Sequence, residues 1–166
     1  MNYTTLDKLD TTDYNILRIL QENGRITNIE LSTKIGLSPG PTLERVKKLE
    51  KSGLIEGYHA RLSREQFKLG VSVFVQVSLS RQVEDVIERF NGKVQEIPNI
   101  MECYQITGNA DYLMKIIVED IPALERLISG TFSKMEEIGN LRTMLIISEK
   151  KLSTVLPLAY EMDYER

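Results

Sequence analysis

Three positively charged side chains recur on one side of residues 38–52, in a pattern that suits contact with a polyanion. At 100° per residue along a helix, Arg45, Lys48 and Lys51 point the same way. The apolar side is assigned to Leu43, Val46 and Leu49. An arginine can donate two hydrogen bonds to a guanine edge, and lysines bind phosphate groups. A basic helix face is also a common solvated surface, so the flanking residues must decide between the two interpretations.

The segment before this basic helix has the residues of a short helix followed by a tight turn. Thr27 and Glu30 have the spacing of a capping box, which predicts a helix that begins at about Asn28. Gly36 suits the left-handed conformation that ends a helix, which puts the turn at residues 36–38. Ser38 can cap the next helix, whose first turn tolerates prolines. A helix, a three-residue turn and a basic second helix form a helix-turn-helix, which reads the DNA major groove.

Two further elements complete residues 1–62 as a winged helix-turn-helix domain. Residues 10–13 offer a cap and first-turn negative charge for an earlier helix, which ends near Gly24. Residues 54–62 are predicted as two short extended pieces, a wing. The side chains expected to contact DNA lie at the start and on the basic side of the second helix of the motif: Ser38, Pro39, Thr42, Arg45, Lys48 and Lys51. Arg45 is the candidate for reading guanine, and the two lysines are expected to meet phosphates.

The second half repeats a strand, helix, strand pattern, which predicts a ferredoxin-like βαββαβ domain and an α+β chain overall. Apolar residues occupy every odd position from Val71 to Leu79, the period of a strand with one buried face. Helices are predicted at 82–95 and 121–135, and further strands at 100–107, 112–118 and 141–148. Residues 63–70 are interpreted as a linker and residues 71–166 as the second domain. The helix-free face of the antiparallel sheet is expected to join identical chains in a homodimer.

The turn formed by Gly108, Asn109, Ala110 and Asp111 has the chemistry to bind an α-amino acid. A glycine-led turn exposes backbone N–H groups that can bind a carboxylate, and Asp111 can pair with an ammonium group. Glycine and aspartate are also the usual residues of a hairpin turn, so this pattern alone leaves an ordinary turn open.

Composition argues against several other classes of function. The 166 residues carry 21 Lys and Arg against 24 Asp and Glu, a net charge of −3, and residues 1–60 are neutral. One neutral module predicts modest attraction to DNA, which several modules acting together would offset. The single Cys103 and the single His59 provide no disulfide, zinc set or catalytic pair, so no catalytic residue, metal or cofactor is expected. Without a leader sequence or a long apolar run, the chain is expected to be cytoplasmic, with no membrane contact.

Together these features resemble the leucine-responsive regulatory protein / asparagine regulator (Lrp/AsnC) family of bacterial and archaeal transcription factors. The resemblance covers almost the whole chain and rests on LDTTDYNILRILQENGRITNIELSTKIGLSP, ERVKKLEKSGLIEGY, MECYQITGNADYLMKI and NLRTMLIISE. Within the family, the MECY, GNADYL and RT pieces look closest to the leucine-responsive member.

The resemblance implies a nucleoid-associated dimer that assembles further to an octamer, wraps double-stranded DNA and responds to an amino-acid effector, leucine or another. It implies that the effector lies between dimers, against the turn from Gly108 to Asp111. Asp111 matches the family's acidic loop position, and Thr143 and Met144 match its effector-sensitive last strand. This chain has Asn109 or Ala110 where close relatives are expected to carry one more acidic residue, so the identity of the effector stays open.

The leading interpretation is a sequence-specific transcriptional regulator of amino-acid metabolism, whose DNA binding or assembly is modulated by a small amino acid. The alternative is an architectural protein that compacts DNA with little sequence choice. A ferredoxin-like metabolic enzyme has less support, because the chain offers no paired nucleophile and base and no phosphate-binding loop.

Overall fold

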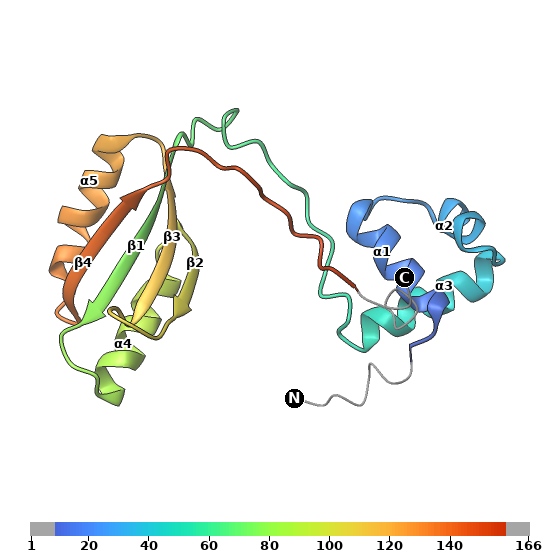
Figure 1. Ribbon diagram of the computed structural model, residues 1–166, viewed down its shortest axis with the longest axis horizontal. Helices are drawn as coiled ribbons and strands as arrows, with labels where there is room; N and C mark the ends of the chain where they lie inside the picture. The colour runs from blue at the N-terminus through green and yellow to red at the C-terminus, as the bar shows by residue number, and fades with distance from the viewer. Residues whose placement is uncertain (1–8, 159–166) are drawn as a thin grey trace. The chain divides into compact units, whose positions relative to one another are not determined.

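The computed structural model describes residues 9–158 and divides them into two compact units (Figure 1). One unit contains residues 9–61 together with residues 151–158, and the other contains residues 62–150. The first unit is helical and the second combines helices with one sheet. The predicted fold class, a helix-turn-helix joined to a ferredoxin-like domain, is therefore confirmed.

The first unit is built from three helices: α1 (Thr11–Glu22), α2 (Asn28–Ile35) and α3 (Pro39–Lys51). Capping boxes start the first two, because Asp10 pairs with Asp13 and Thr27 pairs with Glu30 across the first turn. Gly36 ends α2 at φ 71°, in the left-handed region that side chains with a Cβ rarely adopt. The tight turn between α2 and α3 is thus formed as predicted.

A small apolar core holds the three helices together: Ile16, Leu17, Leu31 and Leu49. The two wing strands predicted at 54–62 are not formed, since no strand lies between α3 and residue 71. The N–H groups of Leu54 and Ile55 donate instead to the carbonyl of Leu49, at 3.2 and 3.4 Å. Both side chains pack against the core, so this segment closes the end of α3 rather than starting a hairpin.

The chain returns to the first unit after the sheet. Leu156 donates its N–H to the Gln21 side chain at 2.6 Å and accepts a hydrogen bond from the same amide at 3.4 Å. Arg18 donates to the Leu158 carbonyl at 3.0 Å, and Leu158 packs against the helical core. The predicted boundary, which kept residues 71–166 together, is corrected at this end, because residues 151–158 belong to the helical unit.

The second unit follows the order β1 (Val71–Leu79), α4 (Glu84–Gln95), β2 (Ile100–Gln105), β3 (Tyr112–Val118), α5 (Ile121–Gly130), a short 3-10 turn η2 (Phe132–Lys134) and β4 (Ile138–Leu145). The sheet order is β2-β3-β1-β4, with every neighbouring pair antiparallel (Figure 1). The last strand begins three residues earlier than predicted, because Ile138 pairs with Leu79 beyond a bulge in the register.

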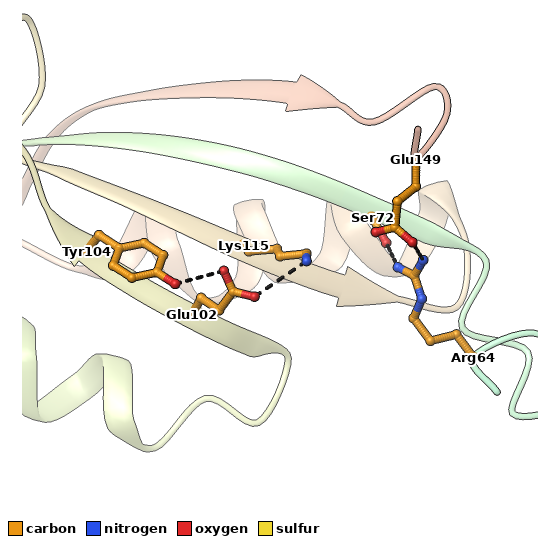
Figure 2. A network of polar contacts seen from close by, with 6 residues as sticks. All are labelled: Arg64, Ser72, Glu102, Tyr104, Lys115 and Glu149. Carbon is orange, nitrogen blue, oxygen red and sulfur yellow. Dashed lines mark hydrogen bonds and ion pairs between the residues drawn. The ribbon is translucent and has the colours of Figure 1, made fainter. Parts of the chain in front are cut away.

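Alternate side chains of β1 point to the two faces of the sheet. Val73, Val75 and Val77 are fully buried and form one core with side chains from both α4 and α5, among them Phe90 and Leu124. Both helices therefore cover the same face, as predicted. The opposite face carries apolar side chains beside an ion pair and its hydrogen bonds: Phe74, Leu113, Met144, Glu102, Lys115 and Tyr104. Figure 2 shows Glu102 of β2 between Tyr104 on the same strand and Lys115 on the neighbouring strand β3.

A buried carboxylate ties α4 to the start of β4. The Glu137 side chain is 3% exposed, and it accepts from Arg89 Nε at 3.2 Å and from Lys93 Nζ at 2.7 Å. The hydrogen bond from Lys93 outweighs the desolvation of the carboxylate and holds the pKa of Glu137 below its ordinary value of 4.5. A carboxyl whose pKa is depressed by folding stabilises the native state above its unfolded pKa and loses that contribution as the pH falls.

Glu137→Gln should therefore lower the free energy of unfolding at pH 7 by about 1–2 kcal/mol, discounted because both cations are partly exposed. The difference from wild type should shrink as the pH falls below 4.5, the ordinary pKa of the group. Urea unfolding at a series of pH values measures both effects. Glu136→Gln is the matched control, because its neighbouring side chain is exposed. Equal losses in the two variants, or a gap that does not shrink as the pH falls, would contradict the assignment.

Candidate functional site

The start of α3 is set by its backbone. Ser38 is the N-cap in an extended conformation, and Pro39 occupies the first turn. The Ser38 carbonyl accepts hydrogen bonds from the N–H and the hydroxyl of Thr42, at 3.3 and 2.9 Å. The Ser38 side chain makes no capping bond, contrary to the expectation from sequence, and both Ser38 and Pro39 are exposed. The first turn of α3 thus presents these two residues to the surroundings.

Thr42 is fully buried, so its place in the predicted DNA-contacting set is wrong. Its hydroxyl is satisfied within the helix, and it lies on the same side as Val46 and Leu49, which pack into the core. This shifts the inner face away from Leu43, which is 42% exposed. The apolar residues alone predict an inner face of α3 that does not include Thr42. A threonine whose hydroxyl hydrogen-bonds to its own helix can be buried like an apolar residue.

Lys47 is the basic residue that the sequence interpretation left out. Its side chain is 60% exposed on the outer face of α3, and its ammonium lies 3.6 Å from the carboxylate of Glu44. Such a surface pair is weak, so Lys47 stays available to a phosphate. Lys48 and Lys51 are exposed as well. Lys47 lies four residues from both Leu43 and Lys51, so these three residues share one face of a helix. This spacing could have identified Lys47 from the sequence.

Arg45 does not share that outer face. Its Nη1 lies 2.7 Å from a carboxylate oxygen of Asp10 and 2.7 Å from one of Asp13, at the start of α1. Hydrogen bonds to Asp13 and then to Asp10 raise the pKa of Arg45. Desolvation raises the pKa of Asp10, but hydrogen bonds from the Asp13 N–H and from Arg45 bring it below its ordinary value. The structure therefore places Arg45 against the start of α1, and its assignment to guanine stays a prediction.

The predicted effector turn is formed, with its acidic residue turned toward its own chain. Gly108 has φ 118°, and both Gly108 and Asn109 are exposed, whereas Ala110 is buried. The Asp111 carboxylate accepts from the Leu79 N–H and from the Gln82 amide, each at 2.7 Å. These bonds fix the turn to the end of β1. Each oxygen keeps a further lone pair, so the carboxylate can still accept a hydrogen bond from an ammonium group.

Thr143 and Met144 do not meet this turn within one chain. They pair with Val75 and Phe74 on β1, whereas the turn leads into β3, on the other side of β1. Two strand spacings, about 10 Å, therefore separate β4 from the strand that carries the turn. The two residues also point to opposite faces of the sheet. Within one chain, the turn and these two β4 residues are therefore not brought into direct contact.

Other chemistry finds little support in the described residues. Within residues 9–158, no group of three or more His, Cys, Asp or Glu side chains could hold a metal ion. Burial raises the pKa of the Cys103 thiol, which makes it a poor nucleophile. No helix of the described part is long and apolar enough to cross a membrane.

Comparison with known proteins assigns both halves of the chain. Residues 9–56 match a winged helix-turn-helix DNA-binding domain model, and residues 72–156 match the Lrp/AsnC ligand binding domain model. The leucine-responsive regulatory proteins of Escherichia coli K12 and Salmonella typhimurium are each 43% identical to this chain over 148 residues, which cover 89% of it and 90% of each relative.

Solved structures give the same answer. A transcriptional regulator from Neisseria meningitidis in complex with L-Met has a TM-score of 0.87 and 38% identity, over 90% of this chain and 96% of that one. An AsnC family transcriptional regulator from Agrobacterium tumefaciens has a TM-score of 0.85 and 32% identity, over 95% and 100% of the two chains. With a helix-turn-helix in one half and the family's ligand-binding domain in the other, the chain belongs to the Lrp/AsnC family of transcriptional regulators and is not an enzyme.

Proposed function

We propose that this protein is a sequence-specific regulator that reads double-stranded DNA with α3 and changes its DNA binding or assembly when an amino acid binds the sheet domain. The observation that carries the DNA half is the combination of an exposed first turn, at Ser38 and Pro39, with lysines along the outer face of α3. In a helix-turn-helix, the first residues of the second helix lie nearest the base edges.

The proposed contacts differ in kind along α3. Ser38 and Pro39 lie where base edges would be reached, and Lys47, Lys48 and Lys51 would meet phosphates. Because residues 1–60 are neutral overall, one unit contributes a modest electrostatic attraction. Several units that bind one duplex together would raise the affinity through avidity.

The effector half rests on the family and on the exposed turn. The Neisseria relative was crystallised with L-Met, and we infer that this chain takes an amino acid of comparable kind, such as methionine or leucine. The N–H groups at Gly108 and Asn109 would receive its carboxylate, and Asp111 would attract its ammonium group. Because β4 is two strands away, we propose that Thr143 and Met144 join the site from another copy of the chain.

Assembly follows from the same requirement. The helix-free face of the sheet, with Phe74, Leu113 and Met144 beside polar groups, suits a contact between two identical chains. We propose a homodimer through this face and further assembly to an octamer. The protein would act in the cytoplasm as a nucleoid-associated regulator.

Lys47→Ala and Lys51→Ala should each weaken binding to all duplexes several-fold and reduce the slope of log affinity against log salt by about one. A fluorescence anisotropy titration at four salt concentrations measures both quantities. Lys134→Ala removes an exposed lysine from the sheet unit and serves as the control. If all three variants bind like the wild type, α3 is not the DNA-contacting helix. If the wild type binds selected and scrambled duplexes equally, the protein is architectural.

Calorimetry with leucine, methionine, glutamine and lysine should show heat of binding for at least one of them, and light scattering should show that the same amino acid changes the assembly. Asp111→Asn should weaken that binding about tenfold, since one ammonium partner worth about 1.4 kcal/mol is lost. Asp85→Asn is the control for an exposed aspartate elsewhere on the unit. No heat and no size change with any of the four would overturn the sensing role.

A further inference from the structure

The capping box that starts α1 also builds a receptor for an arginine of α3. Asp10 uses Oδ1 to accept the Asp13 N–H at 2.9 Å, and Asp13 uses Oδ2 to accept the Asp10 N–H at 3.3 Å. The remaining oxygens, Asp10 Oδ2 and Asp13 Oδ1, both lie 2.7 Å from Nη1 of Arg45. Every carboxylate oxygen therefore has a defined partner, and the helix cap itself orients the two acids toward Arg45.

Burial makes this contact costly to give up. The Asp13 side chain is 8% exposed, and Arg45 is the cation against it. If Arg45 turned outward to a base, a buried carboxylate would remain without its cation, which is strongly unfavourable. The Asp10 side chain is 52% exposed, so it contributes less to this penalty.

The surroundings of Arg45 also disfavour DNA. An open hollow beside it is lined by three acids and two cations: Asp10, Asp13, Glu44, Arg45 and Lys48. A phosphate placed there would meet an excess of negative charge. The outer face of α3, which carries Lys47 and Lys51, offers the opposite sign at greater exposure.

We infer that Arg45 is a positioning residue for DNA reading, which fixes α3 against the start of α1 through Asp10 and Asp13 and makes no base contact. The inference rests on the proposed function of α3. It assigns to Asp10 and Asp13, two acids on a helix that need not touch DNA, a role in binding a polyanion. Removing the negative charge of either acid should then weaken DNA binding, whereas simple electrostatics predicts tighter binding to a polyanion.

The experiment uses the full chain and a duplex selected from a random library by the wild-type protein. Asp10→Asn and Asp13→Asn each remove a negative charge while keeping the shape, and asparagine caps helices as well as aspartate. Each should nevertheless weaken binding to the selected duplex about tenfold. Glu44→Gln removes an acid from α3 without touching the contact, and should leave affinity equal to or tighter than that of the wild type.

Arg45→Gln should cause a comparable loss, spread over all positions in a set of single-base operator variants. Combining Arg45→Gln with Asp13→Asn should add nothing to the loss, because the same contact is already broken. Arg45→Lys, which retains the charge, should recover part of the affinity. Thermal unfolding of each variant shows whether it folds. If Asp13→Asn does not fold, Asp10→Asn still tests the contact.

Three results would overturn the inference. Tighter binding by Asp10→Asn and Asp13→Asn would show that the acids compete with DNA for Arg45. A loss for Arg45→Gln confined to one base pair would show base reading. Additive effects of Arg45→Gln and Asp13→Asn on the melting temperature would show that the two residues are not energetically coupled, so that their contact does not stabilise the fold. If the wild type selects no duplex, the proposed function fails, while the melting comparison still decides the role of Arg45.

Discussion

The ion pair between Arg45 and the carboxylates of Asp10 and Asp13 joins the start of α1 to α3, the helix that we propose reads DNA. The core of the helical unit has four buried apolar side chains, with partly buried apolar side chains packed around them. The hydrogen-bonded contact with the buried Asp13 carboxylate adds a directional constraint to this apolar packing. Once α3 is fixed, its lysines face outward together.

The sheet unit obeys a different constraint. Antiparallel pairing around β1 puts three valines against both helices, and neither helix of the sheet unit covers the other face. The same register places the turn from Gly108 to Asp111 and the residues of β4 on opposite sides of β1. The residues that the family resemblance groups into one effector site thus lie on strands two spacings apart within a chain, and our proposed sensing mechanism therefore includes assembly.

The connections between the units carry their own contacts. Arg64 lies against Ser72 at the start of β1 and against Glu149 just beyond β4, as Figure 2 shows, so one guanidinium holds together both segments that leave the sheet unit. After Glu149 the chain continues into residues 151–158, which bind Gln21 on α1. The strand matched to effector response is therefore joined to the helical unit by a short covalent path as well as by the linker before β1.

Local chemistry determined much of this protein. The capping boxes at Asp10 and Thr27, the left-handed Gly36 and the alternating valines of β1 act over a few residues, and the structure confirms the elements that they predicted. The turn at 108–111 was equally readable. What the residues could not reveal depends on neighbours distant in sequence. Thr42 is buried, Arg45 is turned to α1, the expected wing strands are replaced by packing at Leu54, and Asp111 is bonded to Leu79. Residues 151–158 also return to the first unit. The spacing of residues in the sequence indicates whether an element is a helix or a strand. It does not indicate which side of a helix is buried or which partner a charged side chain has, because tertiary packing decides both.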